Sequence, residues 1–118
     1  MSENELCFLR STELAAKLRR REVSAVEVTE AHLKQIKRVN PKVNAIVTIA
    51  PEQALEAARK ADESLVKGET PGRLHGLPVA HKDLVETKGI RTTYGSPIYK
   101  DHVPDFDCLI VERMKAAG

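Results

Sequence analysis

Glycine and proline are concentrated in one stretch of the chain, and this limits where helices and strands can form. Nine of the twelve residues of these two types lie between residues 68 and 104. Both residues interrupt regular elements and favour tight turns, and loops of this kind often carry function. We therefore expect the longer regular elements before residue 68, short apolar pieces joined by turns at 68–104, and a last helix after them.

Clear start signals predict two helices in the first part of the chain. Ser11 opens a short helix, and Ser24 opens a second one in which Glu27 completes a capping box. Pro41 disfavours helical geometry in the residue before it, so the second helix should end close to that point. The N-terminal helices are therefore placed at 11–39.

A strand and two more helices are expected further along the chain. The run V-N-A-I-V-T-I at 43–49 is rich in β-branched residues, and a helix from Pro51 follows it within 43–67. The modest apolar stripe of this helix predicts that it covers a sheet. The last helix, at 107–117, should be capped by Asp107 and pack through Leu109, Ile110 and Met114. Helices around a strand predict an α/β fold.

Charge and cysteine content exclude several classes of protein. A formal net charge of +2 is far from the basic excess of a nucleic-acid binder, and no apolar run approaches the length of a membrane span. The first residues are acidic and polar, unlike a signal peptide, and the two cysteines have no paired spacing. We expect a cytoplasmic protein that binds neither nucleic acid nor membrane and needs no cofactor or metal. The basic run Arg19-Arg20-Arg21 is most simply a solvated face.

The segment from His75 to Asp83 contains the most informative residues. Lys82 follows, after His81, a short apolar piece, L-P-V-A at 77–80, that is expected to be a strand. Burial disfavours an ammonium group, so a lysine in such a place can be neutral near pH 7 and act as a base. A salt bridge with the adjacent Asp83 or a solvated strand end is the commoner outcome, and the pair His75 and His81 has no further metal ligand. These residues alone leave the function open.

Several separate pieces of the chain together resemble the amidase signature family. The central ones read G-L-P-V-A-H-K-D-L at 76–84, T-K-G-I-R-T-T-Y-G-S at 87–96 and P-D-F-D at 104–107. Their order and spacing make the resemblance much more specific than a short motif. Further pieces that agree lie at 22–28, 40–45 and 113–118.

The resemblance implies a fold, a reaction and a role for four residues. It implies the N-terminal part of the amidase signature fold, in which helices pack on a few strands of a larger mixed sheet. Members hydrolyse carboxylic amides by a Ser–Ser–Lys mechanism, in which a serine attacks the carbonyl, a second serine relays its proton and a lysine is the general base. Lys82 matches the catalytic lysine. Asp83, Gly95 and Ser96 match positions that support the site structurally.

The family's two catalytic serines come from a Gly/Ser-rich segment that follows the last helix seen here. None of the five serines in this sequence lies in such a context. We therefore expect residues 1–118 to be a single incomplete amidase domain, an N-terminal fragment that supplies the lysine and is inactive alone. A small-molecule amide would be the substrate only of the completed domain, and self-association or a partner chain is expected. The alternatives are one component of a split amidase, an amidotransferase A-type subunit, and a non-catalytic binding or scaffold module.

Overall fold

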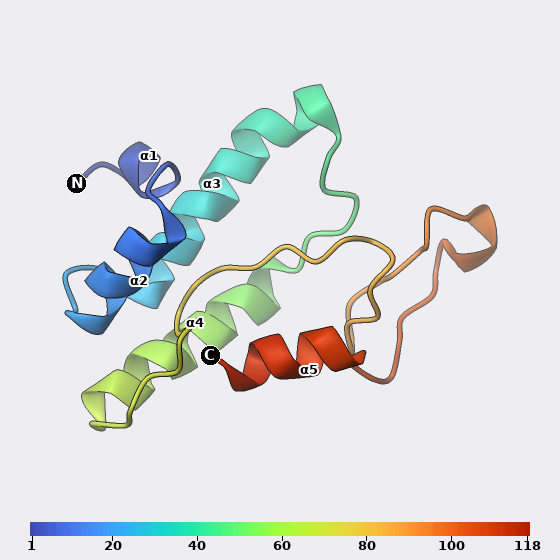
Figure 1. Ribbon diagram of the computed structural model, residues 1–118. Coiled ribbons are helices and arrows are strands. Elements are labelled where there is room, and N and C mark those ends of the chain that lie inside the picture. The colour runs from blue at the N-terminus through green and yellow to red at the C-terminus, as the bar shows by residue number, and fades with distance from the viewer.

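The computed structural model describes residues 1–118, and its regular elements are all helical (Figure 1). The N-terminal helices and α4 lie together, while the chain after α4 runs back across them and then projects as a long loop before the last helix. The elements are α1 (Glu3–Leu6), α2 (Ser11–Arg19), α3 (Ala25–Val43), α4 (Pro51–Val66), the 3₁₀ turn η1 (Pro97–Tyr99) and α5 (Leu109–Ala116).

The start of α3 confirms the capping box expected from the sequence. The Ser24 hydroxyl accepts a hydrogen bond from the Glu27 amide at 3.1 Å, and the Glu27 carboxylate accepts one from the Ser24 amide at 2.8 Å. The hydrogen bonds from the Ser24 amide and then its hydroxyl lower the pKa of the Glu27 carboxyl. Two of the amides that a helix start leaves unpaired are therefore satisfied locally.

The predicted end of this helix is wrong, because α3 continues through Pro41 to Val43. A proline in the last turn removes only one backbone donor, and the helix closes where Asn44 adopts a left-handed backbone with φ of 49°. The Asn44 amide then donates to the Asn40 carbonyl at 2.7 Å. A left-handed asparagine therefore stops the helix where the proline does not.

The predicted position of α4 on a sheet is also wrong, since α4 packs against α3. The Asp62 carboxylate accepts hydrogen bonds from the amides of Ala25 at 2.7 Å and Val26 at 3.1 Å, so α4 caps the start of α3. Ala58 of α4 joins the same buried cluster as residues of α1, α2 and α3. The cluster consists of Leu6, Leu14, Leu18, Ala25, Val28, Ala31 and Ala58.

The strands expected within 43–49 and at 77–80 are absent, and the only β pairing is an isolated bridge between Thr87 and Ile90. A strand requires a neighbouring backbone that shares its hydrogen bonds. In the first segment the Asn40 side chain takes both backbone groups of Ile46, at 2.9 Å each. The second segment has no backbone alongside it that shares its hydrogen bonds. β-branched composition therefore did not predict the structure of the first segment, which begins with the last residue of α3 and the left-handed Asn44.

The last helix, α5, lies on the turn that follows α4. The Leu74 amide donates to the Ala117 carbonyl at 2.9 Å, and a side chain at Gly72 would overlap that same carbonyl. Asp107 does not cap α5, contrary to expectation: its carboxylate accepts from the Lys88 amide and the Lys115 ammonium, each at 2.7 Å.

The buried face of α5 also differs from the one expected. Val111 is fully buried, whereas Leu109 and Ile110 are 62% and 58% exposed. Leu109 and Ile110 thus lie on the open side of this helix, whereas Met114 is half-buried.

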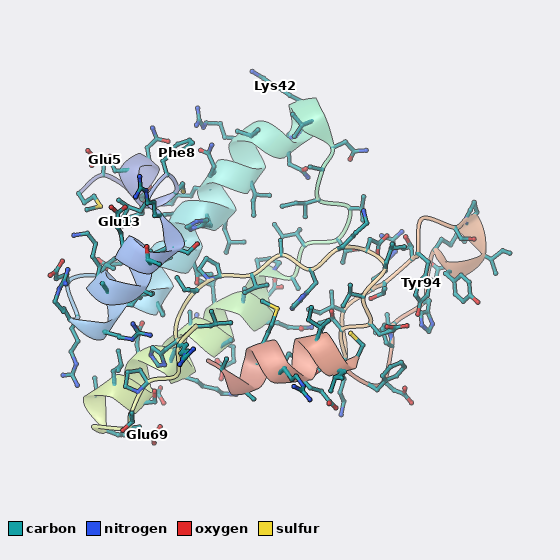
Figure 2. All side chains as sticks on the ribbon, viewed as in Figure 1. Glu5, Phe8, Glu13, Lys42, Glu69 and Tyr94 are labelled. Atoms are coloured by element: carbon teal, nitrogen blue, oxygen red, sulfur yellow. The ribbon has the colours of Figure 1, made fainter.

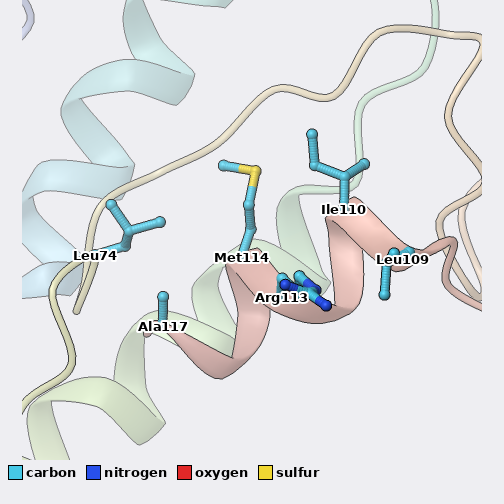
Figure 3. A pocket seen from close by; sticks show the side chains of 6 residues that line it. All are labelled: Leu74, Leu109, Ile110, Arg113, Met114 and Ala117. Carbon is cyan, nitrogen blue, oxygen red and sulfur yellow. The ribbon is translucent and has the colours of Figure 1, made fainter.

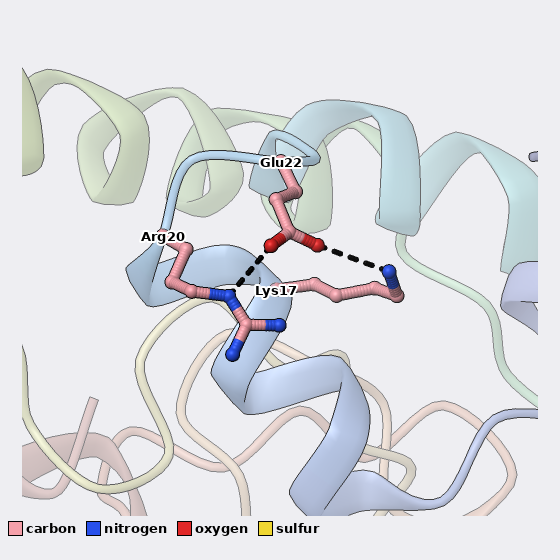
Figure 4. Close-up of polar contacts among 3 residues, drawn as sticks. All are labelled: Lys17, Arg20 and Glu22. Atoms are coloured by element: carbon pink, nitrogen blue, oxygen red, sulfur yellow. Dashed lines mark hydrogen bonds and ion pairs between the residues drawn. The ribbon is translucent and has the colours of Figure 1, made fainter.

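The basic run 19–21 is held by contacts within the chain. Arg20 and Lys17 both bind Glu22, at 2.6 and 3.0 Å, and their hydrogen bonds lower the pKa of Glu22 to about 2 (Figure 4). The Arg19 guanidinium donates to the Arg73 carbonyl, and that of Arg21 donates to the Leu65 carbonyl near the end of α4. These contacts link α2 to α4 and the turn after it.

The helices of this structure do not include one with the length and hydrophobicity that a membrane span requires.

Candidate functional site

Lys82 ends an extended segment and begins a tight turn. Its carbonyl accepts a hydrogen bond from the Val85 amide at 3.0 Å, which closes the turn at 82–85. Its side chain is exposed and makes no ion pair or hydrogen bond within the chain, so the salt bridge with Asp83 does not form. The exposed position agrees with the solvated alternative, and the desolvation that would favour a neutral amine is not present within residues 1–118. A cover over this lysine would have to come from outside residues 1–118.

Asp83 joins the turn that carries Lys82 to the loop that carries Thr93. The carboxylate accepts hydrogen bonds from the Thr93 amide, at 2.8 Å, and from the Thr93 hydroxyl, while the Asp83 carbonyl accepts from the Tyr94 amide at 2.9 Å. The Thr93 hydroxyl and amide lower the pKa of this carboxyl, with the Arg91 guanidinium acting in the same direction and burial opposing it. The backbone direction after Lys82 is therefore fixed by three bonds at a single residue.

Gly95 and Ser96 lie at the far side of the same junction. The Gly95 amide donates to the Thr93 hydroxyl at 3.2 Å, and its φ of 68° is in the region that favours glycine. The Ser96 hydroxyl accepts from the Ile98 amide at 3.3 Å and so starts the η1 turn. The structure thus brings Asp83, Thr93, Gly95 and Ser96 into one continuous set of contacts beside Lys82.

Tyr94 is a further residue of this junction that the sequence did not single out. It adopts a φ of 54°, which is uncommon for a bulky side chain, and its hydroxyl donates to the Glu86 carboxylate at 3.1 Å. Its ring lies 5.0 Å from that of Tyr99 and 5.9 Å from that of His102, on the loop that projects from the helices (Figure 2). The only signal in the sequence is the position of this aromatic directly before Gly95.

A shallow apolar groove of about 460 Å³ lies along α5. Figure 3 shows its lining side chains, with Leu74 on the opposite side from Leu109 and Ile110. Next to Leu74, His75 is buried and its Nε2 has no hydrogen-bond partner. No group of three or more His, Cys, Asp or Glu side chains converges as a metal site would require. Neither the groove along α5 nor His75 supplies a nucleophilic side chain beside Lys82.

The Lys82 side chain carries an amine without an internal partner, on a backbone turn that the hydrogen bonds between Asp83 and Thr93 hold in place. The junction of Asp83 and Thr93 fixes where the Lys82 side chain leaves the main chain, and the amine itself has no internal partner. A lysine placed in this way can accept a proton once a hydroxyl group and a low-dielectric surround are brought to it. Residues 1–118 place no serine hydroxyl in contact with it.

The chain has relatives that are named as the A-type subunit of glutamyl-tRNA(Gln) amidotransferase. The one from Carboxydothermus hydrogenoformans is 45% identical over 114 residues, which are 97% of this chain and 24% of the relative. The one from Methylococcus capsulatus is 52% identical over 106 residues, or 90% of this chain and 22% of the relative. The chain therefore spans about a quarter of the length of these relatives.

Solved structures resemble the chain in the same way. A chain from a vestigial protein complex that bears on the origins of an s-triazine catabolic enzyme superposes with a TM-score of 0.89 at 31% identity, covering 93% of this chain and 24% of that one. The peptide amidase from Stenotrophomonas maltophilia superposes with a TM-score of 0.85 at 29% identity, covering 94% of this chain and 23% of that one.

These neighbours, which include an enzyme described as a member of the amidase signature family, establish the fold. The chain has the architecture of one part of the amidase signature fold, and this part is mostly helical. The amidase family model matches residues 27–118, more than half of the sequence, and the chain therefore belongs to the amidase family.

Proposed function

We propose that residues 1–118 form the N-terminal part of an amidase domain that hydrolyses carboxylic amides by a Ser–Ser–Lys mechanism. Lys82 is the general base, and the two serines come from the remainder of the domain. The observation that carries the proposal is an exposed amine without any internal partner, on a turn that Asp83 fixes to the loop of Thr93. What distinguishes Lys82 from the other exposed lysines is that the carboxylate of the next residue, Asp83, binds Thr93 and so fixes the turn that carries it.

The proposal assigns a defined proton path to Lys82. The neutral amine takes a proton from the bridging serine as that serine takes one from the nucleophilic serine, and the nucleophile attacks the amide carbonyl. On collapse of the tetrahedral species the same relay returns a proton to the departing amine. Asp83, Gly95 and Ser96 have supporting roles, because they hold the turn and the adjoining loop rather than contacting substrate.

One condition follows from the exposed position of Lys82. A lysine acts as a base through its neutral amine, and burial disfavours the charged ammonium form. The proposed reaction therefore needs a surface that buries Lys82 and disfavours the ammonium. We infer that residues 1–118 are inactive alone and become active only with the remainder of the domain, in the cytoplasm and on a small-molecule amide.

Co-expression with the missing partner segment tests this proposal. The chain is produced together with the part of the Carboxydothermus hydrogenoformans relative that lies beyond its matched region, and hydrolysis of a panel of simple amides is measured. Lys82→Ala should lower the rate by on the order of 10³-fold or more. Lys88→Ala is the matched control, since Lys88 is exposed in the same loop region and its side chain makes no hydrogen bond or ion pair. Equal loss in both variants, or no loss in either, would contradict the role of Lys82.

An A-type amidotransferase subunit is the second candidate, favoured by the names of the relatives at 45% and 52% identity. The co-expressed complex separates the two: transfer of an amide group to glutamyl-tRNA(Gln) without hydrolysis of simple amides supports the amidotransferase. A non-catalytic scaffold predicts that Lys82→Ala leaves every measured property of the complex unchanged.

A further inference from the structure

The segment at residues 97–101, called the tip below, projects from the rest of the chain. Figure 1 shows it in orange, at the far end of the long loop that precedes α5. Its 3₁₀ turn exposes Ile98 at 87%, the highest value among the large apolar side chains, and Tyr99 at 45%. An apolar side chain that protrudes in this way gains free energy when another surface covers it.

The groove along α5 is an apolar surface that the chain itself leaves uncovered. Its volume of about 460 Å³ lies within the range of about 300–1,000 Å³ found for sites that hold a bound group. Leu109 and Ile110 line it from α5, and Leu74 lines the opposite side (Figure 3). The groove is too shallow to enclose a small molecule, so a protruding protein segment fits it better. The tip of the same molecule points away from α5 (Figure 1), and such a segment has to come from another molecule.

Unpaired charges of opposite sign lie on these two surfaces. Arg113 is the charged residue that lines the groove, and its guanidinium makes no hydrogen bond or ion pair within the chain. Asp101 of the tip is exposed, and its carboxylate has no internal partner either. The side chains of Lys100 on the tip and Glu112 on α5 are also exposed and unpaired. Opposite charges of this kind select and orient two surfaces that apolar contacts hold together.

The molecule as a whole also exposes more surface than a compact domain of its size. Its accessible surface is 8162 Å². A folded monomer of 13.1 kDa is expected to expose about 6,400 Å² by the usual scaling of surface with mass. The excess of about 1,800 Å² is larger than the ~800 Å² that one partner buries in a standard interface. The chain therefore has enough additional surface for a stable contact with a second copy.

We propose that the chain binds a second copy of itself by placing the tip of one molecule in the α5 groove of the other. Ile98 enters the groove, and Asp101 pairs with Arg113 of the other copy. Pairing of one groove with another is disfavoured, because it would bring two Arg113 side chains to the same surface. A contact between two different surfaces closes into a dimer when both molecules exchange tips. The contact does not involve Lys82 and does not depend on the proposed reaction.

Two charge-reversed variants of the full chain test the pairing of the tip with the groove. Asp101→Arg and Arg113→Asp each place like charges in the contact, so each variant alone should associate about tenfold more weakly, or worse, by analytical ultracentrifugation. An equimolar mixture of the two should recover the affinity of the unmodified chain to within about threefold, because every tip then meets a groove of opposite charge. Asp105→Arg is the matched control, at an exposed loop residue whose side chain makes no hydrogen bond or ion pair, and it should associate normally.

The apolar part of the contact has its own variant. Ile98→Ser should weaken association by about tenfold or more, because it removes the side chain that enters the groove. The helical circular dichroism should stay unchanged, since Ile98 is almost fully exposed in the free chain. Val66→Ser at the end of α4 is the control, because Val66 is 75% exposed and lies on neither surface.

The contact is overturned if the unmodified chain stays monomeric at millimolar concentration, or if both charge-reversed variants associate normally. It is also overturned if the mixture of the two associates no better than its components, since no other pair of surfaces predicts that recovery. A chain that is monomeric alone and covers the groove only when it is co-expressed with the missing partner segment would assign the groove to the remainder of the domain. That result contradicts the second copy as the occupant.

Discussion

Asp83 accepts several hydrogen bonds that together hold its turn against the loop of Thr93. Its carboxylate and carbonyl together receive three hydrogen bonds from Thr93 and Tyr94, residues that follow it by about ten positions. Bonds to a charged acceptor are stronger than bonds between neutral groups, and a buried donor left without its acceptor is costly. At the residue scale, the geometry around Lys82 therefore depends more on its neighbour than on Lys82 itself.

Removing the Asp83 carboxylate should loosen this junction. We expect Asp83→Ala to destabilise the loop of Thr93 locally by about 1–3 kcal/mol, because the Thr93 amide loses its acceptor. The measurement is hydrogen exchange at the Thr93 amide. Asp105→Ala is the control, since Asp105 is exposed and its side chain makes no hydrogen bond or ion pair. Equal exchange at Thr93 in Asp83→Ala and in the unmodified chain would show that the junction does not depend on this carboxylate.

The same carboxylate predicts a dependence on pH. Because the Thr93 hydroxyl and amide lower the pKa of Asp83 from its ordinary 3.8, its stabilising contribution is present above pH 3.8 and is lost as the pH falls through the lowered value. The NMR shift of the Thr93 amide should therefore titrate with a midpoint below 3.8. Asp83→Asn should abolish this titration. A midpoint above 3.8 would contradict the lowered pKa.

At the scale of the elements, the start of α3 was predictable, whereas the cap of α5 and the packing partners of the helices were not. Ser24 and Glu27 specify the start of α3 through bonds to residues three positions away, so the local sequence is sufficient. The cap that Asp62 provides to α3 comes from another helix, and no local pattern shows it. Similarly, Lys82 was found through a family motif, whereas its exposure depends on what lies beside it in space.

The Asp62 cap should contribute measurably to the packing of α4 on α3. Asp62→Ala leaves the amides of Ala25 and Val26 without their acceptor, and loss of such caps costs about 1–2 kcal/mol. Urea unfolding followed by circular dichroism measures the change. Glu63→Ala is the matched control on the adjacent, exposed position of α4, where the side chain has no partner. A control that is as destabilising as the test variant would assign the effect to α4 itself.

The contact of α5 with the turn at Gly72 makes a second prediction for the elements. A methyl group at Gly72 would overlap the Ala117 carbonyl, which is also the acceptor of the Leu74 amide. We expect Gly72→Ala to cost about 1–3 kcal/mol, as overpacking typically does, and to speed exchange at the Leu74 amide. Gly68→Ala meets no neighbouring atom but strains the backbone at its φ of 80°, so it controls for destabilisation elsewhere in the chain and should leave that amide protected. Protection of Leu74 in the Gly72 variant would show that α5 can shift to accommodate the methyl group.

At the scale of the whole molecule, the chain is more extended than a compact domain. The radius of gyration is 14.9 Å, against about 13.5 Å for a compact domain of 118 residues. Only 16 residues are buried, and most of the buried apolar ones belong to the cluster at α1–α4. The lysine loop and α5 therefore have little core of their own and depend on local hydrogen bonds.

Calorimetry of the free chain should show this uneven stability. A compact domain of 118 residues unfolds with a heat-capacity change of about 1.4–1.8 kcal/mol/K, which reflects the apolar surface exposed on unfolding. Because this chain already exposes about 1,800 Å² more than a compact monomer, we expect a smaller heat-capacity change and a broad transition.

Leu109 and Ile110 are exposed on α5, and we expect the chain to self-associate through them. The unfolding temperature should therefore depend on protein concentration, and the double variant Leu109→Lys with Ile110→Lys should reduce that dependence. A single cooperative transition of a monomer, with the full heat-capacity change and equal calorimetric and van't Hoff enthalpies, would contradict this view of residues 1–118.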